Sequence, residues 1–400
     1  MANDTKVKET RVKKDRVGLG ERYAGLPMPA KVVAVTLLLV LVYALPLLRP
    51  PILTTNSIDF GTVMFRVIAF ALVALGLNIV IGYAGLLDLG YVGFYAVGAY
   101  TTAVLTTYHW HWPFFLALPA AVVVTMVSGV LLGAPTLRVR GDYLAIVTLG
   151  FGEIIRITVQ NVEWVGASAG IKDIPHPTGI GAAPNPPFDQ GGLFQIPRLT
   201  WDGFVPIVDL EHKTSFLAFG SRDAVPYYWL ILTFMLLLLI GDRMIKASRV
   251  GRAWEATRED EDAAELMGVP TFKYKLMAFA LGAAIGGLSG SFYASSQAGY
   301  INPQSFPLLL SMLFVAAVVV GGSGNRWGAI AGGAIVAYLP ERFRDFADYR
   351  LLVFGLALTV LAIWRPEGLF PPRRTRRAKA AEAEIEALEE GADNEEATHA

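Results

Sequence analysis

The sequence contains apolar runs long enough to cross a lipid bilayer. A transmembrane helix needs roughly 20 consecutive, mainly apolar residues, and runs of about this length occupy 31–49, 60–81, 113–134, 225–241 and 276–297. Charged residues make up only 17% of the chain and hydrophobic residues 54%, whereas a typical soluble protein is about 25% charged. The sequence therefore predicts an integral membrane protein.

Weaker apolar segments, short or interrupted by glycine, occupy 83–106, 143–163, 306–322, 327–341 and 350–365. With these segments included, we predict an all-α polytopic membrane protein with about 10 (8–11) transmembrane helices, some of them short or discontinuous.

Three regions follow from this pattern: a basic N-terminal tail of 1–30, a transmembrane domain of 31–366, and a C-terminal tail of 367–400. The first run, 31–49, begins late for a cleaved signal peptide, and no small-residue cleavage site follows it. We therefore expect it to be retained as a membrane span.

The charges are sorted by position, although 34 Lys and Arg balance 34 Asp and Glu. A net charge of zero gives no bulk attraction to nucleic acid. Cytoplasmic loops carry an excess of Lys and Arg. Such an excess occurs in 1–30, 137–142 and 373–379, and the 242–275 loop holds seven Lys and Arg. The 164–224 segment holds more acids than bases. We therefore expect both termini in the cytoplasm and 164–224 as an outer loop.

Missing motifs exclude several kinds of chemistry. The chain has no cysteine, which excludes disulfides, thiolate metal sites and cysteine nucleophiles. The glycine-rich stretch 320–328 lacks the Gly-Lys-Ser/Thr of a phosphate-binding loop. The close pair His109 and His111 alternates with tryptophans, which favours interfacial anchoring over metal chelation. We expect no catalytic residue, no metal site and no cofactor on this chain.

A glycine-rich segment with one carboxylate lies at 81–100. Its candidate path residues are Gly82, Gly85, Asp88, Gly90 and Gly93. An acid at membrane depth costs at least ~2.5 kcal/mol and normally faces the interior of the bundle. The segment fits a discontinuous helix that lines a translocation path. It equally fits glycine-mediated helix packing, with Asp88 capping a helix at the membrane surface.

Glu153 and Arg156 lie three residues apart within the predicted span 143–163. This spacing places them on one helix face, where they can neutralise each other. A structural ion pair that locks two helices is the favoured interpretation. The alternative places the pair beside the path, where a zwitterionic solute competes for it.

Two glycine turns share the spacing x-Gly-x-x-Gly, at Ile81–Gly85 and Val320–Gly324. Both an internal repeat and a chance similarity are compatible with this match.

The loop 242–275 contains a helix-forming stretch, Gly251–Val269, that carries both signs of charge. Gly268 at its end is a helix stop signal. Leu266 and Met267 would add a small apolar knob to a polar helix, an arrangement that suits docking into a groove of a cytoplasmic partner. An ordinary solvated loop would hardly need about 30 residues.

This stretch resembles a known family. Asp262-Ala263-Ala264-x-x-x-Gly268 is similar to the Glu-Ala-Ala-x-x-x-Gly coupling motif of bacterial ABC importer permeases, with Asp in place of Glu. The wider sequence resembles LivM-type permeases of branched-chain amino acid importers from about residue 60 to 371. Matching stretches include GYAGLLDLGYVGFYAVGAY, LRVRGDYLAIVTLGFGEIIRI, GRAWEATREDEDAAELMGV and VVVGGSGNRWGAIAGGA.

The resemblance implies a subunit of the bacterial plasma (inner) membrane with a cytoplasmic coupling helix. Its partners would be a homologous LivH-type permease, two cytoplasmic ATPases that bind ATP and Mg, and an extracytoplasmic solute-binding protein. The residues expected to couple to an ATPase are Gly251, Arg252, Glu255, Arg258, Glu259, Asp260, Asp262, Ala263, Ala264 and Gly268.

The implied function is the passage of leucine, isoleucine and valine, driven by ATP hydrolysis on the partner subunits. Related permeases carry urea or short amides, and the quoted motifs do not separate these substrates. A passive channel is a further alternative, but it would not need an ATPase-docking loop.

Overall fold

The computed structural model describes residues 27–54, 59–107, 110–138, 142–177, 195–202, 205–215, 219, 224–296, 299–342 and scattered positions between 349 and 370. The chain forms two compact units, Met1–Leu45 and Pro46–Ala400. Most described residues of the first unit belong to helix α2, Met28–Leu48, which ends just beyond this unit. Its apolar side chains are largely exposed, as at Val32 and Leu37, which suits a helix surrounded by lipid.

Six helical segments of the described residues are long and apolar enough to cross a membrane. They are Met28–Leu48 (α2), Phe60–Tyr83 (α3 with the π-helix η1), Phe114–Thr136 (α5), Tyr143–Asn161 (in α6), Thr271–Ala294 (α10) and Pro303–Gly321 (η4 with α11). Further helices are α4 (Tyr91–Thr107), α7 (Val225–Ala247) and α12 (Arg326–Arg342). The prediction of a helical membrane protein is confirmed. The count of about ten crossings stays a prediction.

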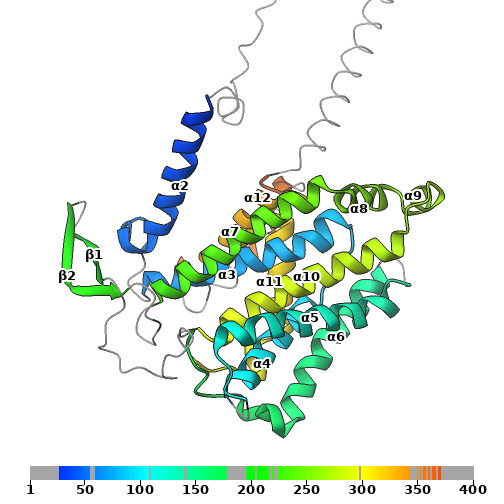
Figure 1. The fold of residues 1–400 in the computed structure, drawn as a ribbon, viewed down its shortest axis with the longest axis horizontal. Helices are drawn as coiled ribbons and strands as arrows, with labels where there is room; N and C mark the ends of the chain where they lie inside the picture. The colour runs from blue at the N-terminus through cyan, green and yellow to red at the C-terminus, as the bar shows by residue number, and fades with distance from the viewer. Residues whose placement is uncertain are drawn as a thin grey trace, which may run out of the picture. The chain divides into compact units, whose positions relative to one another are not determined.

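The second unit is built around α3 and α10. Within their apolar stretches, 72% and 67% of residues are buried, against 28% for α5 and 22% for α6. α10 packs against α3, α4 and α5, and Figure 1 shows it between α3 and α5. α4 and α10 approach closely at Gly98, where an added Cβ would collide with the Gly287 backbone. Small residues permit such close packing between membrane helices.

The helix that begins at Phe60 does not continue into α4. α3, Phe60–Leu77, changes into the π-helix η1, Asn78–Tyr83, and the chain is non-helical until Tyr91. Gly85 has a φ of +73°, a left-handed conformation that glycine adopts without steric cost. The predicted discontinuity of the helix is therefore present at this point.

The 164–224 segment contains the strands of the described chain. β1, Gln195–Asp202, pairs antiparallel with β2, Val205–Ser215, with an irregularity between Pro197 and Arg198. This hairpin is an addition to the predicted all-α fold. Earlier in the segment, Ile171 forms an isolated antiparallel bridge with Ile301, and the Ile174 amide donates to the Gly299 carbonyl at 3.0 Å.

Some predictions concern residues outside the described ranges. They are the tail residues 1–26 and 371–400, the connection 139–141, the 178–194 part of the expected outer loop, His109 and much of the expected span 350–365.

Candidate functional site

The stretch predicted to bind an ATPase forms two short helices. α8 runs Arg249–Glu259 and α9 runs Glu261–Leu266. Asp260 separates them with an extended backbone (φ −152°, ψ 109°), and its Oδ1 accepts a hydrogen bond from the Ala263 amide at 2.9 Å. An aspartate at this position stabilises a helix start by satisfying a free amide. The predicted helical stretch is confirmed, with a break at Asp260.

α9 ends at a left-handed glycine. Gly268 has a φ of +85°, and its amide donates to the Glu265 carbonyl at 2.9 Å, while the Val269 amide donates to Ala264 at 3.0 Å. These bonds satisfy carbonyls that a helix end leaves free. An added Cβ on Gly268 would meet no heavy atom within 4 Å, so backbone conformation, not space, calls for glycine here.

The surface of α9 combines charge with exposed apolar side chains. Leu266 and Met267 are 89% and 85% exposed, and Asp262 and Glu265 are also exposed. Ala264 is buried beneath them. The predicted apolar knob is therefore present at the end of α9.

α8 is attached to the membrane helices by a buried tryptophan. Trp254 is fully buried, its Nε1 donates to the Tyr274 carbonyl of α10 at 2.7 Å, and its ring stacks on Tyr83 with 6.5 Å between centroids. Glu261 at the start of α9 forms an ion pair with Lys275 of α10. The two helices thus have fixed contacts with α10 and with the π-helical end of α3.

The first part of the glycine-rich segment lies against α8. Arg258 donates a hydrogen bond from Nη1 to the Gly82 carbonyl, and an added Cβ on Gly85 would lie 2.8 Å from Arg258 Cγ. Gly324 also lies here, because its amide donates to Asn78 Oδ1 at 2.8 Å. The two x-Gly-x-x-Gly turns are therefore neighbours in space.

The second part of the segment packs on α6. Asp88 is fully buried, and its Oδ1 accepts from the Gly90 amide at 2.9 Å just before α4 begins. Its Oδ2 has no hydrogen-bond partner among the described residues. Added Cβ atoms on Gly90 and Gly93 would press on α6, the latter 2.9 Å from the Phe151 ring. Asp88 thus accepts a hydrogen bond beside a helix start, as the capping interpretation expected, and its side chain is buried within the protein.

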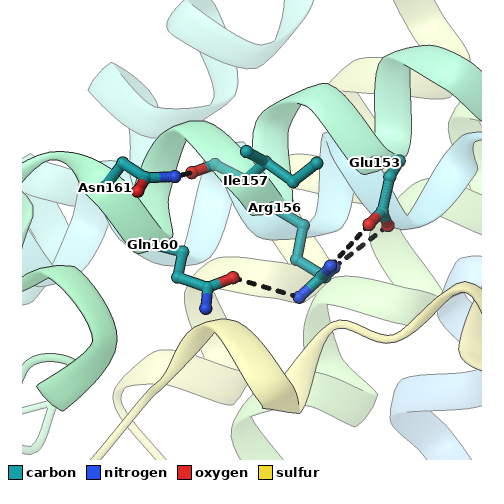
Figure 2. A network of polar contacts seen from close by, with 5 residues as sticks. All are labelled: Glu153, Arg156, Ile157, Gln160 and Asn161. Carbon is teal, nitrogen blue, oxygen red and sulfur yellow. Dashed lines mark hydrogen bonds and ion pairs between the residues drawn. The ribbon is translucent and has the colours of Figure 1, made fainter.

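Glu153 and Arg156 form the predicted ion pair on α6, Asp142–Asn161 (Figure 2). Arg156 donates from Nη2 to Glu153 Oε1 at 2.5 Å and from Nε to Oε2 at 3.0 Å, and from Nη1 to Gln160 Oε1 at 3.4 Å. The side chains are 26% exposed for Arg156 and 39% for Glu153. The pair lies within one helix, so the expectation that it locks two helices together is not met by these bonds.

The sequence matches one family over most of its length. Residues 60–362 fit the family described as "Branched-chain amino acid transport system / permease component". The chain belongs to this permease family.

Curated relatives agree with the match. The permease is 38% identical to the high-affinity branched-chain amino acid transport system permease protein LivM of Salmonella typhimurium LT2, over 84% of this chain and 75% of the relative. The LivM protein of Escherichia coli K12 gives the same values. The permease protein LivH of Escherichia coli K12 is 35% identical over 34% of this chain and 46% of the relative. No solved structure matches the chain. With its several apolar helices, the permease is a multi-pass membrane protein.

The sequence did not single out every residue that the structure gathers around α8. Asn78, Tyr83, Lys246 and Trp254 were not among the predicted site residues. The tryptophan at position 254, within a highly charged loop, is a sequence signal for this region, because such a large apolar side chain needs a surface to cover it.

Proposed function

We propose that the chain is a transmembrane permease subunit of a bacterial ABC importer that carries leucine, isoleucine and valine. The observation that carries the proposal is the 38% identity to LivM proteins over 84% of the chain. No enzymatic step is assigned to this chain, and ATP with Mg would be bound by partner subunits.

The proposed topology has about ten membrane crossings, the number that the apolar runs suggest. The protein would lie in the bacterial inner membrane, with both termini in the cytoplasm. The distribution of basic residues supports this orientation. It places α8 and α9 on the cytoplasmic side and the hairpin β1–β2 outside.

The proposed partners are a LivH-type permease, two ATPases and a solute-binding protein. The similarity to LivH over a third of the chain supports a pair of homologous permeases. α8 and α9 would dock on one ATPase, because their exposed face combines Leu266 and Met267 with charges of both signs. An amphipathic helix that fits a groove is a recurring mode of recognition.

The path is proposed to run beside α4 and α6. Its candidate residues are Gly90 and Gly93 at the start of α4, the buried Asp88, and the partly exposed pair Glu153 and Arg156. A buried acid in a membrane protein is by default a functional candidate. Gly82 and Gly85 contact Arg258 instead, so we assign them to the attachment of α8.

The test is uptake by the reconstituted complex. The permease is assembled in liposomes with the LivH-type permease, the ATPases and the binding protein encoded in the same genome, and uptake of labelled leucine is followed with and without ATP. We expect ATP-dependent uptake of labelled leucine, and we expect unlabelled isoleucine and valine to reduce it. If urea or acetamide, but not isoleucine or valine, reduced the uptake, the complex would be an amide importer. If uptake were the same with and without ATP, the protein would be a channel.

A further inference from the structure

Four segments of the chain come together in the region of Arg258. They are the π-helix η1, the end of α7, helix α8, and the turn between α11, Leu308–Gly321, and α12. We call the residues that make these contacts the Arg258 cluster, which consists of Gly82, Tyr83, Lys246, Trp254, Arg258 and Gly324.

The central contact is a charge-assisted hydrogen bond at a helix end. Arg258 Nη1 donates to the carbonyl oxygen of Gly82, in the last turn of η1. The last carbonyls of a helix lack partners within the helix, and the negative end of the helix dipole favours a cation. The bond therefore attaches α8 to the end of α3 at a point that has free acceptors.

Two glycines make room for the arginine side chain. An added Cβ would lie 2.8 Å from Arg258 Cγ at Gly85 and 2.9 Å from Arg258 Nη1 at Gly324. Both glycines are left-handed, with φ of +73° and +88°, so a side chain would be strained there for backbone reasons as well. Arg258 thus lies between two turns whose glycines leave it space.

Other members of the cluster hold the same segments together. Lys246 Nζ donates to the Gly324 carbonyl at 3.1 Å and lies 4.7 Å from the centre of the Tyr83 ring. Trp254 stacks on the same ring, with the two planes 20° apart. α8 therefore has two connections to the end of α3, one polar and one aromatic.

We propose that Arg258 is a positioning residue that makes α8, the π-helical end of α3 and the α11–α12 turn move as one body. The inference rests on the proposed function, in which α8 and α9 dock on an ATPase. A π-helix is a rare element that often marks a functional site, and η1 stands where α3 gives way to the non-helical segment before α4. A displacement of α8 would reach that segment through Arg258 and Gly82.

The first experiment uses the complete complex in liposomes and compares ATP hydrolysis with leucine uptake. Arg258→Ala should leave the ATPases bound and hydrolysing ATP, but lower the leucine taken up per ATP about tenfold, the loss expected for one hydrogen bond to a charged group. Arg258→Lys should recover part of this ratio, because an ammonium can still bond to the Gly82 carbonyl. Arg243→Ala, an exposed arginine on α7, is the control for lost charge and should match the wild type.

The outcomes separate this inference from the proposed function. A wild-type complex without ATP-driven uptake would reject the proposed function itself. If the wild type and Arg258→Ala took up the same amount of leucine per ATP, the inference about Arg258 would be overturned, while the proposed function would stand. Loss of the ATPases from the Arg258→Ala complex would also overturn it, because Arg258 would then act in docking.

A distance measurement tests the movement directly and does not depend on transport by the variant. The chain has no cysteine, so the double variant Arg249→Cys with Trp327→Cys carries spin labels only on α8 and at the start of α12. We expect one narrow distance in the complex with and without ATP. Arg258→Ala in the same background should broaden the distribution, and an unchanged narrow distribution would overturn the inference.

Discussion

The side-chain oxygen of Asn78 accepts a hydrogen bond from the backbone amide of Gly324 at 2.8 Å, across 246 positions of sequence. Asn78 begins the π-helix η1 and is fully buried. Gly324 lies in the turn between α11 and α12, where its φ is +88°. One side chain therefore joins η1, which contains Gly82, to the glycine turn at Gly324, and it does so beside the helix that we propose to dock on an ATPase.

Asn78→Ala should destabilise the permease. The substitution leaves the buried Gly324 amide without its acceptor, and an unsatisfied buried donor costs about 1–3 kcal/mol. The thermal unfolding midpoint of the purified protein in detergent should therefore fall. Asn161→Ala is the matched control, because Asn161 is exposed and its side-chain amide donates to the Ile157 carbonyl of its own helix at 2.7 Å. Equal midpoints for the two variants would contradict this account of Asn78.

Gly268→Ala should weaken uptake without preventing insertion into the membrane. Alanine in the left-handed conformation at φ +85° costs roughly 1–2 kcal/mol, so α9 would end differently and displace Leu266 and Met267. Gly268→Asp should abolish uptake, because it also adds a charge at this surface. Leucine uptake is measured against the amount of permease in isolated membranes.

The control for this position is Gly241→Ala in α7. Gly241 is helical and an added Cβ meets no heavy atom within 4 Å, so alanine there should stabilise the helix by up to about 1 kcal/mol. If both Gly268 variants took up leucine as well as the wild type, the proposal that α9 contacts an ATPase would be wrong.

The sequence was informative wherever one strong physical requirement acts on neighbouring residues. Membrane burial demands long apolar runs, so most spans were predicted close to their observed bounds. The helical character of 251–266 follows from its composition, and the helix stop at Gly268 follows from a glycine placed shortly before Pro270. The pairing of Glu153 with Arg156 needs only helical spacing.

Contacts between distant segments were not predictable in this way. The break at Asp260 was missed because a long charged helix and two short helices have similar compositions, and only the capping bond to Ala263 separates them. The meeting of Gly82 with Gly324 depends on how α3, α11 and α12 pack. The similarity of the two glycine turns was visible in the sequence, but that similarity does not show whether the turns lie close together in space.

Asp88→Asn should lower uptake while leaving the amount of permease in the membrane unchanged. The amide oxygen of asparagine can still accept from the Gly90 amide, so the local bond of 2.9 Å is retained and the fold is preserved. The variant removes the negative charge, which we propose to serve the path. Asp173→Asn, at an exposed aspartate with a φ of +54°, should not change uptake, since asparagine tolerates that conformation. Unchanged uptake in Asp88→Asn would leave Asp88 with a structural role only.

Acid should destabilise the permease through His176. Burial lowers the pKa of this imidazole below its ordinary value, although a backbone hydrogen bond at Ser295 opposes the shift. Its Nδ1 lies 2.6 Å from the Tyr227 hydroxyl at the start of α7. Because the unfolded chain binds the proton more tightly, the stabilising contribution is present above the unfolded pKa of about 6.5 and is lost as the pH falls through the folded value.

The measurement is the thermal unfolding midpoint between pH 8 and pH 5, for the wild type and His176→Gln. Glutamine cannot be protonated in this range, so the variant should lose less stability than the wild type as the pH falls. The two curves should differ most at the acidic end, where the imidazole of the unfolded chain is charged. Parallel curves for the wild type and His176→Gln would show that the contact with Tyr227 does not depend on a neutral imidazole.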